Sequence, residues 1–128
     1  MILDSSPIVA IVPREQGHES LVEKIGQATI VAVGAPTLSE ATIVLSSRLG
    51  RDARGIISRL LMEGAIETIP LTDAHFSVAV SAWLHYGKGR HKASLNFGDC
   101  LAYAVAQVAG EPLLFTGRDF TKTDIEAA

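Results

Sequence analysis

Short apolar runs alternate along this chain with segments of helical periodicity, and that alternation limits the possible fold more than any other feature. Strands separated by helices are expected to run parallel, because each helical crossover returns the chain to the same end of the sheet. We therefore predict an α/β fold with a mainly parallel central sheet of four or five strands. The expected strands are Ile2–Leu3, 29–33, 66–70 and 113–115, and the tail near Ile125 could add an edge strand.

The expected helices are placed by apolar residues at three- and four-residue spacing and by residues that favour helix ends. Ser6 is a good N-cap and Pro7 suits the first helical position, so a helix should begin there. Thr37 and Glu40 have the spacing of a capping box at the start of another helix, which Gly50 should end. Further helices are expected over 19–26, 51–62, 72–86 and 97–109.

The large apolar side chains are assigned to the core. Phe76, Ala79, Val80 and Trp83 share one stripe of the helix expected over 72–86, and Phe115 lies in the last expected strand. Cys100 falls inside a helix, with no histidine placed in sequence to activate it. A buried and inert thiol is therefore expected there.

Length and composition are those of an ordinary globular protein. At 128 residues, the chain is expected to form a single domain over 1–128. The net charge of −3 does not indicate a nucleic-acid partner, so any such binding needs a local basic patch. The single cysteine, the lack of a secretory signal pattern and the lack of a long apolar run favour a cytoplasmic protein with no membrane partner.

Four acidic residues occupy similar places in the predicted pattern. Asp4 follows the first strand, Glu40 begins a helix after the second, Asp99 begins a later helix, and Asp119 follows the last clear strand. Ligands bind at the carboxyl ends of the strands in an open parallel sheet, so these acids could converge there. Two carboxylates about 4 Å apart repel by roughly 4 kcal/mol at an effective dielectric of 20, which calls for protons or a cation. Oxygen-only ligands favour Mg²⁺ or Mn²⁺, which can activate water for attack on a phosphodiester.

Each of the four acids also has a purely structural explanation. An acid in the first turn of a helix stabilises the helix dipole. Glu40 could complete a capping box with Thr37, and Asp99 also has the spacing of a helix-capping acid. Asp4 could bond to backbone amides in its turn, and Asp119 could be a solvated loop acid. The spacing of the acids alone does not decide between the two explanations.

The acids and their neighbours resemble the motifs of the PIN-domain ribonucleases, and among these the VapC-type toxins of bacterial toxin–antitoxin pairs. Residues 1–6 resemble the first motif, with hydrophobic residues followed by an aspartate and two hydroxyls. Residues 36–40 resemble the second motif, 96–104 with 110–115 the third, and 117–120 the fourth. One such motif would be weak evidence, but four in the family's order over nearly the whole chain are specific.

That resemblance implies a three-layer α/β/α fold and endonucleolytic cleavage of RNA by a water that Mg²⁺ activates, with Mn²⁺ as a possible substitute. Asp4, Glu40 and Asp99 would be catalytic, metal-binding carboxylates. Many members of the family carry an acid where this chain has Gly117 and a second acid two positions later. Only Asp119 remains here as the fourth acid, and it would bind the metal directly or through water.

The same resemblance extends to supporting residues and partners. Ser6 matches a hydroxyl position of the family and would hold Asp4 or a water in place, and Thr116 would add a second hydroxyl. The family also implies a homodimer and a cognate antitoxin whose tail enters the acidic site. An arginine from such a tail could neutralise the carboxylates as a metal does.

A glycine-rich loop at 87–92 holds the densest basic cluster of the chain. Its cations could contact RNA phosphates, which dominate nucleic-acid affinity, or could form an ordinary solvated loop. The candidate RNA-binding residues are Lys88, Arg90, His91, Lys92 and, near the mouth of the site, Arg118.

Two other functions stay open on the sequence alone. Gly117 suggests a PIN-like domain that has lost its nuclease activity and works through protein contacts. A receiver-like signalling module with an acidic Mg²⁺ pocket is the second alternative. It would need a lysine late in the chain between a strand and a proline, and Lys122 lies outside such a context.

Overall fold

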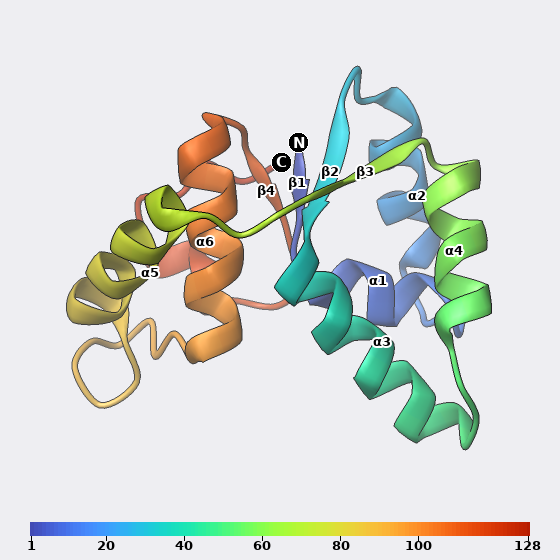
Figure 1. Ribbon diagram of the computed structural model, residues 1–128, viewed down its shortest axis with the longest axis horizontal. Coiled ribbons are helices and arrows are strands. Elements are labelled where there is room, and N and C mark those ends of the chain that lie inside the picture. Colours follow the sequence, from blue (N-terminus) through green and yellow to red (C-terminus); the bar gives the residue numbers. More distant parts are fainter.

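The computed structural model describes every residue from 1 to 128, and Figure 1 shows helices on both sides of a narrow sheet. None of the helices combines the length and apolar character needed to cross a membrane. The strands are β1 (Ile2–Leu3), β2 (Val31–Gly34), β3 (Ile66–Ile69) and β4 (Leu113–Leu114). The helices are α1 (Ser5–Ile11), α2 (His18–Gln27), α3 (Ala35–Leu49), α4 (Arg54–Glu63), α5 (Asp73–Tyr86) and α6 (Phe97–Ala109), followed by the 3₁₀ helix η1 (Asp119–Lys122).

All strands pair in parallel in the order β3-β2-β1-β4, which confirms the predicted parallel sheet. β1 lies inside the sheet, with Ile2 opposite both Ala32 of β2 and Leu113 of β4. The edge strand expected near Ile125 is reduced to one isolated bridge between Leu113 and Ala127. Because the strands are parallel, their carboxyl ends lie at one edge of the sheet, where β1 leads into α1 and β2 into α3.

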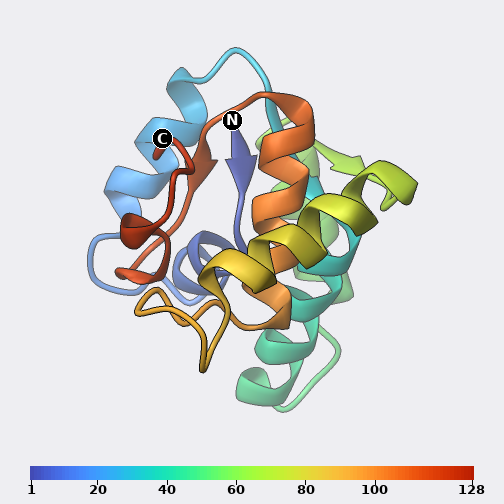
Figure 2. The same cartoon turned by 90° about the vertical axis from the view of Figure 1, so that its left-hand side faces the viewer.

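Side chains that alternate along the strands divide the core into two clusters. Ile2 and Leu113 pack with small residues of α5 and α6 on one face of the sheet. Leu3 and Leu114 pack on the other face with residues from α1, α2, α3 and α4. Figures 1 and 2 show the same division, with α5 and α6 on one side of the sheet and the other four helices opposite. The three-layer α/β/α architecture is therefore confirmed.

The start of α1 differs from the prediction, because Asp4 rather than Ser6 is its N-cap. The Asp4 side chain accepts the backbone N–H of Ser6 at 3.2 Å, and the helix begins at Ser5. Pro7 is consequently the third helical residue and not the first. Aspartate caps a helix as well as serine does, and β1 delivers Asp4 directly to the capping position. The Ser6 hydroxyl is then free to bind Asp4 itself.

The capping box predicted for Thr37 and Glu40 is wrong. α3 begins at Ala35 directly after Gly34, so Glu40 lies in the second turn, too far from the helix start to cap it. Gly50 ends α3 as predicted, with a left-handed φ of 66°. The structural explanation for Glu40 therefore no longer applies.

α5 is apolar on two faces, and the core assignment of its stripe holds only for part of it. Ala79 is buried and packs in the cluster that contains α6. Phe76 and Trp83 are 70% and 43% exposed, so their assignment to the core is wrong. Phe115 is partly buried against the core as expected, and its ring centroid lies 5.1 Å from that of Phe120.

Candidate active site

Asp4 stands at the carboxyl end of β1 and is only 5% exposed. Its carboxylate accepts the Ser6 hydroxyl at 2.6 Å and the Ser6 backbone N–H at 3.2 Å. Burial raises the pKa of Asp4 above its ordinary value, the Ser6 hydrogen bonds lower it, and the charge of Glu40 raises it. No lysine or arginine forms an ion pair with Asp4. The carboxyl end of β1, a strand inside the sheet, is therefore followed by a buried carboxylate without a cationic partner.

Ser6 connects Asp4 to the loop that follows β4. Besides donating to Asp4, its hydroxyl oxygen accepts the backbone N–H of Thr116 at 3.0 Å. The structure thus brings both predicted hydroxyl residues to the site, but Thr116 contributes its backbone amide to this contact. Because the same loop continues to Asp119, Ser6 ties the first and fourth sequence motifs together.

Asp99 lies in the first turn of α6, where it combines a capping role with a place among the acids. Asn96 accepts the backbone N–H of Asp99 at 2.9 Å, and the Asp99 carboxylate accepts that of Asn96 at 3.0 Å. The pKa of Asp99 is nevertheless raised to about 6, first by burial and then by repulsion from Asp4, Asp119 and Glu40. Three acids that are far apart in the sequence therefore act electrostatically on a fourth.

Glu40 reaches the site from the second turn of α3 and takes part in no ion pair. Its carboxylate lies against Gly98, and the two residues line a hollow of about 410 Å³ between α3 and α6. Thr37 lines the same hollow and is 3% exposed. Its hydroxyl is the one buried side-chain polar atom of the chain without a hydrogen-bond partner. An unpartnered buried hydroxyl is unfavourable, and because this oxygen has almost no accessible surface it does not face the hollow itself.

Asp119 is exposed at the start of η1. Its effect on the pKa of Asp99 places its charge at the same site. Gly117, the position at which the family often has an acid, has a left-handed φ of 81° that side chains rarely adopt. In this chain a glycine turn therefore stands in place of the additional acid.

The donor set of this site has the chemistry that a hard divalent cation requires. All four groups are carboxylates, and no arginine or lysine forms an ion pair with any of them. No three acid, histidine or cysteine side chains lie close enough to ligate a single ion directly in this arrangement. Mg²⁺ suits a spread set of this kind, since it usually keeps several waters and takes one or two protein carboxylates.

The loop at 87–92 lies at the end of the molecule where β1 and β2 end and α6 begins (Figure 1). The Arg90 guanidinium lies 5.0 Å from the centre of the Trp83 ring, and its Nε donates to the carbonyl of Leu84 at 3.2 Å. His91 packs edge-on against Tyr86, with ring centroids 5.3 Å apart. Arg90 and His91 thus hold the loop in place. Lys88, Arg90, Lys92 and Arg118 are exposed and make no ion pair, and of these only Arg90 is engaged by an aromatic ring.

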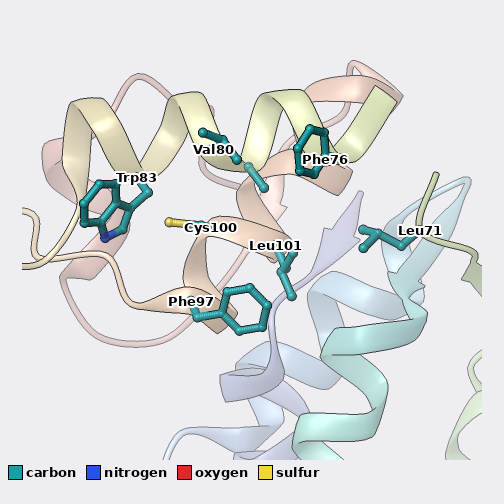
Figure 3. Close-up of a pocket in the computed structure, with 8 residues that line it drawn as sticks. Leu71, Phe76, Val80, Trp83, Phe97, Cys100 and Leu101 are labelled. Atoms are coloured by element: carbon teal, nitrogen blue, oxygen red, sulfur yellow. The ribbon is translucent and has the colours of Figure 1, made fainter. Parts of the chain in front are cut away.

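An apolar hollow of about 450 Å³ between α5 and α6 is a feature that the sequence pattern missed. Figure 3 shows Phe76, Val80 and Trp83 extending over it from α5, and Phe97 and Leu101 from α6. Phe97 is 79% exposed and also lines the hollow beside α3, so apolar surface continues up to the acidic site. We call this surface the apolar face and define it by Leu71, Phe76, Val80, Trp83, Phe97 and Leu101.

Comparisons with known proteins agree with the fold and with the resemblance to the PIN-domain family. The family model of the PIN domain matches residues 1–126. Ribonuclease VapC36 of Mycobacterium tuberculosis is 45% identical over 127 residues, which cover 98% of this chain and 91% of that protein. The crystal structure of M. tuberculosis VapC20, a sarcin-ricin loop cleaving toxin, aligns with a TM-score of 0.79 at 15% identity, covering 99% of this chain and 97% of that one. A toxin–antitoxin complex from Klebsiella pneumoniae aligns with a TM-score of 0.72 at 15% identity, covering 96% and 92%.

This chain belongs to the PIN-domain family. The resemblance to VapC-type proteins is confirmed by a relative of high identity over nearly its whole length. The solved structures confirm the predicted fold, and at 15% identity they are evidence for the fold alone.

Proposed function

We propose that this chain is a divalent-cation-dependent endoribonuclease and acts as the toxin of a toxin–antitoxin pair. The observation that carries the proposal is Asp99, whose pKa is raised to about 6 by burial and by three further carboxylates. No cationic side chain balances these charges. Kinship with VapC ribonucleases supports RNA as the substrate and phosphodiester hydrolysis as the reaction.

The four carboxylates would together bind Mg²⁺, or Mn²⁺ in its place. Asp4, Glu40 and Asp99 would hold the ion, one or two of them directly and the rest through its bound waters, and Asp119 would also reach it through water. When bound, the ion would lower the pKa of a water and stabilise charge on the phosphodiester. The chain itself keeps the carboxylates in position, since Ser6 fixes Asp4 and the capping box fixes Asp99.

The RNA would approach across the end of the molecule that carries the basic loop. Lys88, Lys92 and Arg118 are exposed and would contact backbone phosphates. Arg90 and His91 would act indirectly by keeping the loop in shape, because both already contact aromatic rings of α5. Contacts of this kind position the RNA without selecting its sequence.

The acidic site would also receive a cognate antitoxin. A toxin–antitoxin complex shares the fold of this chain, and a cationic side chain from an antitoxin could replace the charge of the metal. An arginine of the antitoxin, for example, would pair with the same carboxylates and would occupy the space of the ion. The partners would meet in the cytoplasm, the compartment that a single free cysteine favours.

A second copy of this chain would cover the apolar face. Phe76 and Phe97 on this face are 70% and 79% exposed. With roughly 150–250 Å² of surface on each aromatic side chain, Phe76, Phe97 and Trp83, the last 43% exposed, together expose on the order of 400 Å² of this face. That area is about half of the roughly 800 Å² that each partner buries in a standard interface, so the contact would extend beyond these three rings. A homodimer through α5 and α6 would therefore remove this surface from water.

The nuclease is tested by cleavage of a mixed RNA set with Mg²⁺, Mn²⁺ or EDTA. Wild-type protein should cut only with the ion, and Asp4→Ala and Asp99→Asn should each lose activity. Asp73→Asn is the matched control, because Asp73 is an exposed acid in the first turn of α5. A folded Asp99→Asn variant with undiminished activity would refute the assignment.

A PIN-like domain without nuclease activity is the competing function, favoured by the glycine turn at Gly117 and by the wide spacing of the acids. Calorimetry of Mn²⁺ binding separates the two. Binding that is lost in Asp4→Ala supports the nuclease, whereas a wild-type protein that binds no ion supports a role through protein contacts alone.

A further inference from the structure

Gly98, the second residue of α6, leaves open a space that the Glu40 carboxylate fills. A Cβ built on Gly98 would overlap Oε2 of Glu40 and would lie 3.0 Å from its Cδ and 3.1 Å from its Oε1. We propose that Gly98 is a positioning residue of the active site, because its missing side chain lets the Glu40 carboxylate reach from α3 to the first turn of α6, beside Asp99. The inference rests on the proposed function, since it gives Gly98 a part in the same metal site.

The crowding at Gly98 differs from that at every other glycine of the chain. Gly55 is also the second residue of a helix, α4, and no atom lies within 4 Å of its Cβ position. Gly34, Gly64 and Gly87 are crowded by apolar or aromatic side chains or by backbone. Only at Gly98 is the space taken by a carboxylate, so this glycine makes room for a functional group and not for core packing.

The position of the Glu40 carboxylate depends on the space left at Gly98, because few other contacts hold this side chain. No ion pair holds it, and its flexible side chain can rotate. The first turn of α6 offers backbone N–H groups that lie outside the helical ladder and the positive end of the helix dipole, both of which favour a carboxylate. The charge of Glu40 also raises the pKa of Asp99, which lies in the first turn of α6. A side chain at position 98 would keep Glu40 away from this turn.

Substitution of Gly98 by alanine should change the geometry of the site without lowering the stability of the fold. Gly98 lies in a helix and has no left-handed φ, so an alanine fits its backbone and reduces the entropy of the unfolded chain. The atoms that the new Cβ would meet are the far end of the Glu40 side chain, which can rotate away. Gly98→Ala should therefore fold at least as stably as wild type while its Glu40 carboxylate is displaced.

The first test compares Gly98→Ala with Gly55→Ala in the full chain. Mn²⁺ binding without RNA is measured by electron paramagnetic resonance, and thermal unfolding is measured in EDTA. Both variants should keep or raise Tm, and only Gly98→Ala should bind Mn²⁺ more weakly, by about tenfold or more. In a Glu40→Ala background, Gly98→Ala should cause no further loss of affinity, because the displaced group is already gone. Wild-type affinity in Gly98→Ala would overturn the proposal.

Crystal structures of wild type and Gly98→Ala distinguish a failure of this inference from a failure of the proposed function. If the wild-type protein binds no Mn²⁺, the metal site fails, but the position of Glu40 can still be observed. A Glu40 carboxylate that has moved off α6 in the variant supports the positioning role. A carboxylate that stays in place overturns it. A Tm below that of wild type in Gly98→Ala but not in Gly55→Ala also overturns it, since the glycine would then serve packing.

Discussion

The hydroxyl of Ser6 donates a 2.6 Å hydrogen bond to Oδ2 of Asp4, the most buried acid of the site. The same oxygen accepts the backbone N–H of Thr116 at 3.0 Å, so one hydroxyl joins the end of β1 to the loop after β4. That loop leads to Asp119 in η1. Loss of the Ser6 hydroxyl would therefore loosen two parts of the site together.

Ser6→Ala should lower metal-dependent cleavage by about 10–100-fold, as loss of a group that orients a metal ligand typically does. The hydrogen bond lowers the pKa of Asp4, so its loss should move the acidic limb of the pH–rate profile to higher pH. Ser5→Ala is the matched control, because Ser5 offers Asp4 only its backbone N–H. Ser6→Thr keeps the hydroxyl and should restore the profile. Identical profiles for Ser6→Ala and wild type would show that the hydroxyl is dispensable.

Asp99 should destabilise the fold at neutral pH when no divalent ion is present. Its pKa is about 6 in the folded protein against 3.8 as the ordinary value, so the folded state binds more protons between these two values. The stability linked to Asp99 therefore falls as the pH rises from 3.8 to about 6 and stays low above that. Asp99→Asn removes the charge but keeps an oxygen that can accept the backbone N–H of Asn96.

Calorimetric unfolding in EDTA checks this prediction. The Tm of Asp99→Asn minus that of wild type should be small near pH 4, grow towards pH 6 and then remain constant. Asp73→Asn, which alters an exposed first-turn acid of α5, should show no such growth. A difference that does not change with pH would mean that Asp99 titrates alike in the folded and unfolded chains.

Mn²⁺ should stabilise the wild-type protein more at pH 7.5 than at pH 5, because the ion and a proton compete for Asp99. At an ion concentration of about 100 times Kd, binding to the folded state alone adds about 2.7 kcal/mol to the free energy of unfolding. The Tm shift should shrink in Asp99→Asn. NaCl at matched ionic strength controls for screening of the carboxylates. An equal shift with NaCl would show that screening, and not a bound ion, is responsible.

Most of the fold could be predicted because its signals are local. The alternation of strands and helices and the glycine stop at Gly50 depend on neighbouring residues only. Three helix starts were wrong: the helix expected from Arg51 begins at Arg54, and the starts at Ser6 and Thr37 each have an earlier residue that competes as the cap. The strand ends at Leu3 and Gly34 decide that competition, and local propensity does not show where a strand will end.

The candidate site could be predicted as a set of acids but not as an arrangement. The order of the four motifs predicts Asp4 and Asp99 as members of the site, whereas the contact between Glu40 and Gly98 depends on how α3 and α6 pack. The apolar face was missed because periodicity identifies a helix without showing which of two apolar sides is buried. The sequence did contain a signal for a second apolar side, because α5 carries apolar residues outside the predicted stripe, such as Leu84. A helix that buries only one face is normally polar at such positions.

Phe76→Glu should convert a dimer into a monomer without unfolding the chain. Phe76 is 70% exposed and belongs to the apolar face, so the fold does not depend on its burial, whereas a dimer through α5 and α6 would bury it. A glutamate there would have to be desolvated at the contact, which is strongly unfavourable without a partner charge. Light scattering after size exclusion at micromolar concentration should give a dimer for wild type and a monomer for the variant. Met62→Glu is the matched control, because Met62 is 76% exposed on α4, outside the apolar face, and its change should leave the dimer intact. A wild-type monomer, or a dimer that persists in Phe76→Glu, would show that a second copy does not cover the apolar face.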